Sequence, residues 1–388
     1  MPVLNRFAEM LPEISAWRRD IHAHPELRFE EHRTAAFVAA KLEEFGCDEI
    51  ITGFGGTGVV GVINGKTGST GKTIGFRADM DALPIQEATG LPHASTIPGK
   101  MHACGHDGHT SMLLGAAKYL AETRNFDGRV VLAFQPAEEG GGGARAMIEA
   151  GLMDRWAIEE VYGMHNMPGI APADFAVRTG PQMASPDKFE ITVRGTGGHG
   201  AMPHKGVDTT LVAAQIVVAL QSIVSRNIDP MDKVVVSVCG FRTDTATYNV
   251  IPDSAKLLGT VRTFDPKVQQ EVRERIDALA TATALGYGAV ADVVHISGPP
   301  PLLNHAREAD MAAEVAQTVS GVAHRDLDPI MAGEDFSEML LERPGAYLFI
   351  GNGDSTDLHN PSYEFNDEII PAGCSWFVQM AERLMPLA

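Results

Sequence analysis

Segments with strand-like and helix-like periodicity alternate along most of this 388-residue chain, and that alternation restricts the fold to an α/β sheet. The continuous apolar run at 129–136 is typical of a strand buried on both faces, whereas 109–124 is a strongly apolar helical segment. Further strands are expected at 161–166 and, as neighbours separated by a Gly/Ser/Thr turn, at 59–65 and 72–79. Since helices connect these strands, the sequence predicts a mostly parallel sheet.

The pattern changes near residue 184 and resumes after residue 297. Between these points the expected order is strand, helix, strand, strand, helix, strand, which is the ferredoxin-like arrangement. We therefore predict an α/β catalytic domain made of residues 1–183 and 298–388. An α+β domain of the ferredoxin-like type is inserted into it at 184–297.

The net charge and the cysteine content indicate which binding partners and which cellular compartment to expect for this protein. The formal net charge is −19, whereas nucleic acids and anionic membranes are bound by clustered positive charge. No apolar run reaches the roughly 18 residues of a membrane helix, and the N-terminal segment lacks the features of a signal peptide. The four cysteines contain no CxxC pair, so we expect a cytoplasmic protein without a nucleic-acid or membrane partner.

Side chains of the metal-binding type recur at strand ends and in loops, where open α/β sheets place their sites. Asp79 and Asp81 follow one expected strand, His165 ends another, and His359 lies in a polar loop after a third. Two carboxylates at the end of an apolar strand are costly unless they are paired or close to a cation. Each feature alone is also typical of a turn or a structural histidine, but their recurrence at several places favours a site.

The segment MHACGHDGHT, at 101–110, is the richest of these places. Cys104 and His106 stand two residues apart, which suits a metal with thiolate and imidazole ligands. The same two residues could instead be a nucleophilic cysteine and its histidine, or be structural. Metal binding is the interpretation that we favour.

Glu138 and Glu139 come just after the hydrophobic strand at 129–136 and precede four glycines. Glycines without side chains allow a close approach to the glutamates. Because adjacent residues point in different directions, one glutamate can bind a metal while the other faces a substrate water. Glutamate pairs are also common on solvated faces, but the buried strand and the glycines favour a site.

Over nearly its whole length the chain resembles the amidohydrolase branch of the M20 metallopeptidase family. That branch contains hippurate hydrolases, N-acetyl amino acid deacetylases and plant auxin–amino acid conjugate hydrolases. The resemblance implies a zinc-peptidase-like α/β catalytic domain with an inserted ferredoxin-like lid, in agreement with the organisation above. It rests on these segments, in order: RRDIHAHPEL, RADMDALPI, HACGHDGHTSMLLGAA, FQPAEEGGGGARAMIEAGL, GGHGAMPH, NVIPD, GEDF and LHNP.

The resemblance also implies roles for individual residues of the catalytic domain. Glu138 would be the general base, and Asp81 would orient a metal ligand without binding the metal. Asp79 stands where other branches of the family carry a ligand histidine, so the metal could be zinc, manganese, nickel or cobalt. The implied ligands of two divalent ions per subunit are Cys104, His106, Glu139, His165 and His359.

Three residues of the lid receive roles by the same resemblance. His199 would reach the active site of a partner subunit and steady the oxyanion, which implies a homodimer or a larger homo-oligomer formed through the lid. Asn249 and Arg262 would contact the substrate, although an arginine on a strand is as often a surface residue. Glu334 and Asp335, in GEDF, receive no defined role.

These inferences predict a metal-dependent amidohydrolase that cleaves the amide bond of small N-acyl amino acids, such as hippurate or N-acetyl amino acids. A metal-activated water would attack the amide, with Glu138 as general base. The alternatives are a dipeptidase or aminoacylase of the same family, an amide hydrolase with Cys104 as nucleophile, and a non-catalytic binding protein. Chelation separates the metal enzymes from a Cys104 nucleophile, because only a metal enzyme loses activity with its metal. A panel of acyl amino acids and dipeptides separates the amidohydrolase from a dipeptidase, and a non-catalytic protein would release nothing from the panel.

Overall fold

The computed structural model describes residues 3–388, and the chain divides into two compact units. The larger unit consists of three stretches: the residues up to Gly180, Leu303–Asp328 and Asp335–Ala388. The smaller unit consists of two: Pro181–Leu302 and Pro329–Glu334. Sequence analysis placed an inserted domain at 184–297, and that exact division of the chain stays a prediction.

The larger unit is built on an eight-stranded sheet with the order β1-β2-β4-β3-β5-β16-β6-β15. The four central strands β4, β3, β5 and β16 run parallel, while β1 and β2 pair antiparallel at one side and β6 pairs antiparallel with β16. The mixed α/β class is therefore confirmed, with its parallel strands at the centre. The strands are β1 (Glu49–Phe54), β2 (Gly58–Asn64), β3 (Thr73–Asp79), β4 (Arg129–Gln135), β5 (Glu160–Pro168), β6 (Phe175–Ala176), β15 (Ala323–His324) and β16 (Gly345–Gly353).

The prediction that β2 and β3 are neighbours is wrong, because β4 lies between them and pairs with both. The connecting segment passes the start of β4 instead of forming a hairpin. Gly65 N–H donates to the carbonyl of Gly128 at 2.9 Å, and Arg129 N–H donates to that of Lys72 at 2.9 Å. The Gly/Ser/Thr-rich sequence between β2 and β3 is therefore compatible both with a hairpin turn and with this longer connection.

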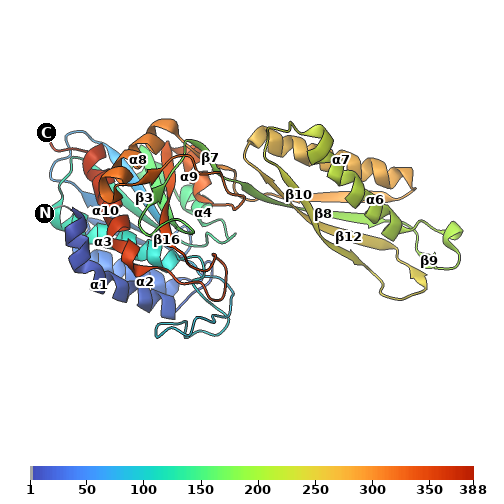
Figure 1. Ribbon diagram of the computed structural model, residues 1–388, viewed down its shortest axis with the longest axis horizontal. Helices are drawn as coiled ribbons and strands as arrows, with labels where there is room; N and C mark the ends of the chain where they lie inside the picture. Colours follow the sequence, from blue (N-terminus) through green and yellow to red (C-terminus); the bar gives the residue numbers. More distant parts are fainter. Residues whose placement is uncertain (1–2) are drawn as a thin grey trace. The chain divides into compact units, whose positions relative to one another are not determined.

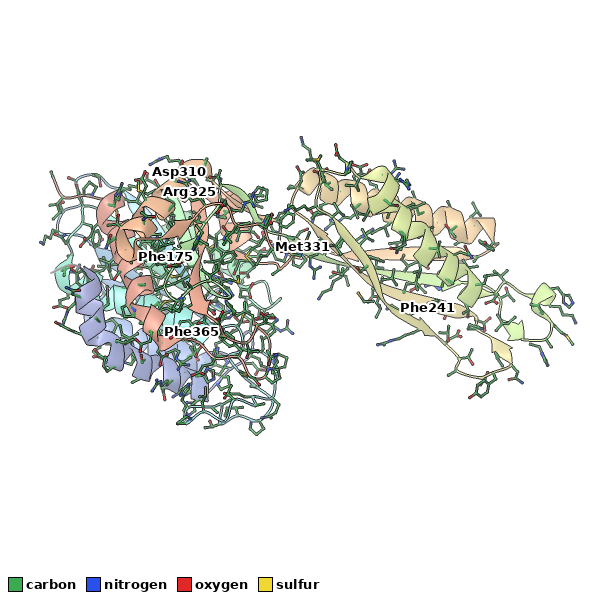
Figure 2. The ribbon with its side chains drawn as sticks, in the orientation of Figure 1. Phe175, Phe241, Asp310, Arg325, Met331 and Phe365 are labelled. Atoms are coloured by element: carbon green, nitrogen blue, oxygen red, sulfur yellow. The ribbon has the colours of Figure 1, made fainter. Side chains whose placement is uncertain are left out.

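Helix α3 is the central helix of the larger unit, and it packs against α1, α10 and the sheet (Figure 1). It is buried around most of its circumference, as expected for a helix that is apolar on all sides. Gly108 lets the ring of Phe365, labelled in Figure 2, lie directly against this helix. The helices are α1 (Val3–Ala23), α2 (His32–Phe45), α3 (His106–Thr123), α4 (Gly143–Glu149), α5 (Leu152–Arg155), α8 (Ala306–Ser320), α9 (Phe336–Glu342), η3 (Asp367–Ile369) and α10 (Ile370–Leu384).

The smaller unit has a four-stranded antiparallel sheet with the order β10-β12-β8-β13, and α6 and α7 pack side by side on one face (Figure 1). Its chain order β8-α6-β10-β12-α7-β13 is the predicted β-α-β-β-α-β arrangement. Separate from this sheet, β9 and β11 form a two-stranded ribbon. The elements are β8 (Ser185–Arg194), β9 (Gly198–His199), η1 (Pro203–Lys205), α6 (Thr209–Ser222), η2 (Ile223–Asn227), β10 (Val235–Thr243), β11 (Val250–Ile251), β12 (Ser254–Thr263), α7 (Pro266–Gly286) and β13 (Val290–Ile296).

Two short strands, β7 (Gly180–Met183) and β14 (Leu302–Asn304), lie where the chain passes from one unit to the other. The helix over Thr209–Asn227 is long and apolar enough to cross a membrane, with a mean hydropathy of 1.4. The sequence expectation of no such run does not hold for this helix. Its inner residues, including Val212, Ile216 and Leu220, are part of the apolar core of the smaller unit, and 33% of the apolar window is buried.

Candidate active site

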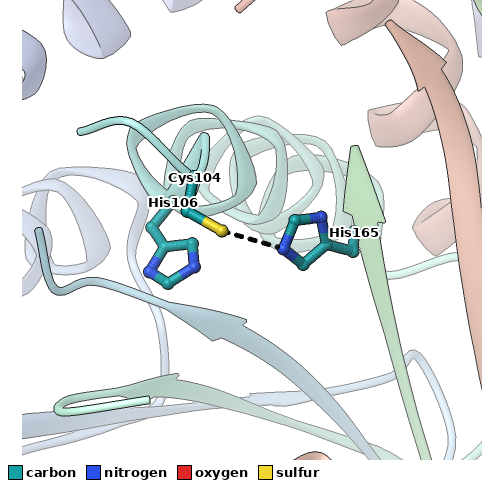
Figure 3. A group of neighbouring side chains, drawn as sticks. All are labelled: Cys104, His106 and His165. Atoms are coloured by element: carbon teal, nitrogen blue, oxygen red, sulfur yellow. Dashed lines mark hydrogen bonds between the residues drawn. The ribbon is translucent and has the colours of Figure 1, made fainter. Parts of the chain in front are cut away.

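The five predicted metal ligands come together at the carboxyl ends of the parallel strands, where α/β folds place their sites. Cys104 lies just before α3 and His106 is its first residue. Glu139 follows β4, His165 lies on β5, and His359 lies in the loop after β16. Figure 3 shows the Cys104 sulfur directed at the ring of His165. The potential ligand atoms form two groups, each within 4.8 Å: Cys104, His106 and His165, and Cys104, Glu139 and His359.

The two buried histidines each keep one ring nitrogen for a metal ion. His106 Nδ1 donates to the carbonyl of Asp81 at 2.9 Å, and its buried Nε2 has no hydrogen-bond partner among the described residues. His165 Nδ1 donates to the carbonyl of Asn166 at 2.6 Å, which leaves Nε2 at 3.3 Å from Cys104 Sγ. An unpaired buried nitrogen such as His106 Nε2 is costly, and a bound cation would accept its lone pair together with that of His165 Nε2.

Negative charge accumulates around these ligands. Burial alone would lower the pKa of His106, but the carboxylates of Asp79 and Asp81 raise that pKa to about 10. Burial, followed by the charges of Glu139 and Glu138, raises the pKa of the Cys104 thiol well above its ordinary value. Carboxylate charge contributes to both shifts, and divalent cations would neutralise that charge.

Asp81 fixes the turn that carries the two glutamates. One carboxylate oxygen accepts the backbone N–H of Glu138 and the other accepts that of Glu139, each at 3.0 Å. The same residue accepts the hydrogen bond from His106 through its carbonyl. The carboxylate of Glu138 lies within 4.8 Å of His106 and Glu139, so one aspartate orients both glutamates and a histidine beside them.

His359 differs from the other predicted ligands because about half of its side chain is exposed. Its backbone adopts a positive φ of 62°, and its N–H donates to the carbonyl of Ala103 at 2.8 Å. Its Nε2 lies 3.1 Å from Glu139 Oε1. The strained backbone of a residue with a Cβ is thus held in place next to Cys104, as is common at functional sites.

Asp79, at the position where other branches of the family carry a ligand histidine, contacts two basic side chains. Its carboxylate accepts hydrogen bonds from Arg77 and His109, each at 2.6 Å. Although burial opposes it, the charges of His106, Arg77 and His109 hold the pKa of Asp79 well below its usual range. Its negative charge is therefore balanced inside the protein itself.

Sequence analysis gave no role to His109, Arg77 or Asn166. His109 Nε2 accepts the backbone N–H of Asn166 at 2.9 Å, and the Asn166 amide donates to the carbonyl of Cys104 at 2.7 Å. This chain of contacts joins Asp79 to the segment that carries Cys104. A signal was present, because His106 and His109 are three residues apart and therefore share one face of a helix.

Asp335, of the GEDF segment, anchors the glycine-rich loop to the sheet. Its carboxylate accepts from Arg77 at 3.0 Å, from the Gln135 amide at 2.8 Å and from the N–H of Ala144 at 3.0 Å. Gln135 ends β4 and Ala144 lies in the first turn of α4. The residue therefore fixes both ends of the loop that contains the two glutamates, a function that the sequence alone left undefined.

Two of the three predicted lid residues lie close together on the β9–β11 ribbon. His199 is exposed and pairs with Val250 across the ribbon, and the exposed Asn249 precedes that strand. Ala201 N–H donates to His199 Nδ1 at 3.1 Å, so the proton of the neutral ring is on Nε2. The ribbon therefore presents an exposed imidazole N–H donor beside an asparagine.

Arg262 lies apart from this ribbon, on β12. Its guanidinium donates to the carbonyls of Met331 at 3.2 Å, Val261 at 3.0 Å and Asp187 at 3.4 Å. These contacts give the arginine a structural function inside the smaller unit. A contact between Arg262 and substrate stays a prediction.

Comparisons with known proteins agree with this geometry. Residues 75–383 match the model of peptidase family M20/M25/M40. The chain is 43% identical to the hippurate hydrolase of Campylobacter jejuni subsp. jejuni, over 99% of this chain and 100% of that protein. It is 42% identical to an N-acetyl-L-cysteine deacetylase of Bacillus subtilis, over 95% of this chain and 87% of that protein.

A solved structure with a similar fold comes from Bacillus subtilis and is described as a dinuclear metal-binding peptidase of the M20 family. It superposes with a TM-score of 0.85 and 35% sequence identity, covering 97% of this chain and 99% of that one. The family match spans most of the chain, and the identities extend over nearly all of it. The chain therefore belongs to peptidase family M20/M25/M40, as a metal-dependent amidohydrolase of that family.

Proposed function

We propose that this protein hydrolyses the amide bond of small N-acyl amino acids with two divalent metal ions per subunit. The observation that supports this most strongly is the pair of three-residue ligand groups that share Cys104, with Glu138 beside them. Zinc, manganese, nickel and cobalt all accept this set of thiolate, imidazole and carboxylate ligands. The relatives named hippurate hydrolase and N-acetyl-L-cysteine deacetylase support an N-acyl amino acid as the substrate.

In the proposed mechanism, Cys104, His106, Glu139, His165 and His359 hold the metals. The bound ions would supply Lewis acidity, which lowers the pKa of a water and neutralises developing negative charge. Glu138 accepts the proton of the attacking water and passes it to the leaving amine. Asp81 holds Glu138 and Glu139 in their orientations through the two backbone N–H groups.

The lid contributes a hydrogen-bond donor in this proposal. His199 Nε2–H, supplied by a partner subunit, donates to the oxyanion that forms on the amide carbonyl. Asn249, next to it on the ribbon, and Arg262 contact the substrate. A donor with an exposed N–H suits this function, because the group has no competing acceptor within its own ribbon.

The same proposal includes a homodimer or larger homo-oligomer formed through the smaller unit, in the cytoplasm. Large exposed apolar side chains on this unit are the observation that favours an interface there. Phe241 on β10, labelled in Figure 2, is 42% exposed, and Val218 on α6 is 66% exposed.

A hydrolase with Cys104 as nucleophile is the less supported alternative. Nucleophilic cysteines need an electropositive surrounding that stabilises the thiolate. Cys104 is buried among carboxylates that raise its pKa, so without a metal its thiolate is disfavoured. A dipeptidase of the same family would use the same residues and differ only in the substrate it accepts.

The first test is to remove metal with a chelator and restore Zn²⁺, Mn²⁺, Co²⁺ or Ni²⁺ one at a time. Amino acid release is then measured from N-acetyl and N-benzoyl amino acids, with dipeptides in parallel. We expect metal-restored release from acyl amino acids. Release from dipeptides alone would assign a peptidase, and activity that survives chelation would assign the reaction to Cys104.

A further inference from the structure

Glu31 is a fully buried carboxylate whose position is unusual for a residue at the start of a helix. It is the N-cap of α2, yet its side chain forms no capping hydrogen bond. Glu26 caps the helix instead and accepts the backbone N–H groups of Arg33 at 2.9 Å and Thr34 at 2.8 Å. The Glu31 side chain is therefore directed elsewhere.

Its two oxygens contact the loop before the catalytic glutamates and a neighbouring strand end. Oε1 accepts the backbone N–H of Ala137 at 2.9 Å, and Oε2 accepts the hydroxyl of Thr57. Asp81 accepts the next two N–H groups, those of Glu138 and Glu139. Two buried carboxylates thus hold three successive backbone N–H groups of one turn.

Ala137 has a backbone conformation that needs such support. Its φ is 54°, in the left-handed region that is disfavoured for residues with a Cβ. A different φ at Ala137 would rotate the chain that follows, and with it the carboxylates of Glu138 and Glu139. The hydrogen bond to Glu31 is made at the N–H of this strained residue.

The burial of Glu31 has no obvious benefit for stability. Within the described chain, no basic side chain forms an ion pair with it, and burial raises its pKa. A buried carboxylate without a cation is costly even when it is hydrogen bonded. Glu31 nevertheless accepts hydrogen bonds from the backbone N–H of Ala137, in the turn, and from the Thr57 hydroxyl. These contacts favour a function in fixing the geometry of the turn.

We propose that Glu31 is a positioning residue that holds Ala137 in its left-handed conformation, so that Glu138 reaches the water and Glu139 reaches the metal. The inference rests on the proposed function for the tasks of those two glutamates. It assigns a function to the HPELRFEE segment, at 24–31, to which Glu31 belongs. Glu31 itself touches neither substrate nor metal in this proposal.

The test compares Glu31→Ala with Glu31→Gln and with Glu30→Ala, in which the neighbouring exposed glutamate is removed. Loss of a hydrogen-bond partner that orients a metal ligand typically lowers metal affinity or activity by about 10–100-fold. We expect Glu31→Ala to lower kcat, and to weaken binding of one of two metal ions, by about that factor, with KM within about threefold. Glu31→Gln should stay close to wild type, because its oxygen accepts from Ala137 while Thr57 accepts from its amide.

A second substitution separates positioning from general stability. Glycine adopts a positive φ without strain, so Glu31→Ala with Ala137→Gly should recover part of the lost kcat and metal affinity. A destabilising effect alone would lower the Tm of Glu31→Ala and leave kcat and metal affinity of the folded enzyme at wild-type values. That result would overturn the proposal, as would an equal loss in Glu30→Ala.

Thr57→Val provides the measurement if Glu31→Ala does not fold. It removes the donor to Oε2 and should produce a smaller loss in the same direction, whereas wild-type kcat and metal affinity would overturn the proposal. Metal titration by calorimetry also separates this proposal from the proposed function. If wild type released no amino acid from any substrate, that function would fail, while weaker metal binding in Glu31→Ala would still support the positioning role.

Discussion

The candidate site residues of the two units have opposite environments. In the larger unit, Cys104, His106 and His165 are buried and contact one another or fixed neighbours. In the smaller unit, His199 and Asn249 are exposed and are held mainly by the backbone of a short ribbon. The contrast agrees with the proposed roles, in which buried side chains of the larger unit hold metal and exposed side chains of the ribbon act on a partner subunit's site.

The two sheets show the same contrast. Every residue of β3 in the larger unit is buried, whereas exposed and half-buried residues alternate along β13 in the smaller unit. Strands covered on both faces are continuously apolar, and strands covered on one face alternate. Along β13 the smaller unit therefore has one sheet face that its own helices do not cover.

The largest effect is expected from Glu138→Gln, because it removes the base and keeps the metal ligands of the larger unit. We expect kcat to fall by about 10²–10⁴-fold, the usual contribution of a general base. Metal content, measured by elemental analysis, should stay at the wild-type value. Retention of more than about a tenth of the activity would show that another group accepts the proton.

The contrast between the units is tested by His199→Ala, which changes only the exposed ribbon. We expect kcat to fall by about 10²–10³-fold, as after loss of one oxyanion donor, with metal affinity unchanged. Mixed with Glu138→Gln subunits, the variant should regain activity, since a hybrid dimer contains one site with both residues intact. Verified hybrids without any recovery would rule out a contribution across the subunit interface.

A smaller effect is expected from Asp81→Asn in the larger unit. The amide nitrogen cannot accept the N–H of Glu138 or Glu139, so the turn loses one of its contacts. We expect losses of about 10–100-fold in kcat and in metal affinity. Asp48→Asn, at a surface pair with Arg124, is the control; an equal loss there would point to a general effect of charge.

The last prediction concerns stability and not activity, and it is made at the buried pair of His22 and Asp107. Against the opposing effect of burial, the Asp107 carboxylate raises the pKa of His22 to about 9. Because this pKa lies above the unfolded value of about 6.5, the pair stabilises the fold fully below pH 6.5 and loses that effect as the pH rises through 9.

Urea unfolding of metal-free wild type and His22→Gln measures this contribution. Wild type should be more stable by roughly 3 kcal/mol near pH 6, and the difference should shrink as the pH approaches 9 and beyond. A difference that is constant over this pH range would mean that His22 acts through packing and not through its charge.

The sequence by itself determined the α/β class, the ferredoxin-like order of the smaller unit and the set of candidate ligands. Periodicity reports burial, so strands such as β4 and helices such as α7 follow from local pattern. Residue types suited to metal binding, such as Cys104 before a helix and Glu139 after a strand, can be recognised in the sequence without the fold. The resemblance of the ordered motifs to one family then gave these residues their expected tasks.

Only the tertiary structure decided which residues support the ligands. Glu31 and Ala137 are 106 positions apart, and Arg77 and Asp335 are 258 apart, so no local pattern joins them. The position of β4 between β2 and β3 could likewise not be predicted, because the sequence of a turn determines where the chain bends and not which strands pair. Hydrogen bonds between distant segments depend on the packing of the whole sheet, and for that reason they became visible only in the folded chain.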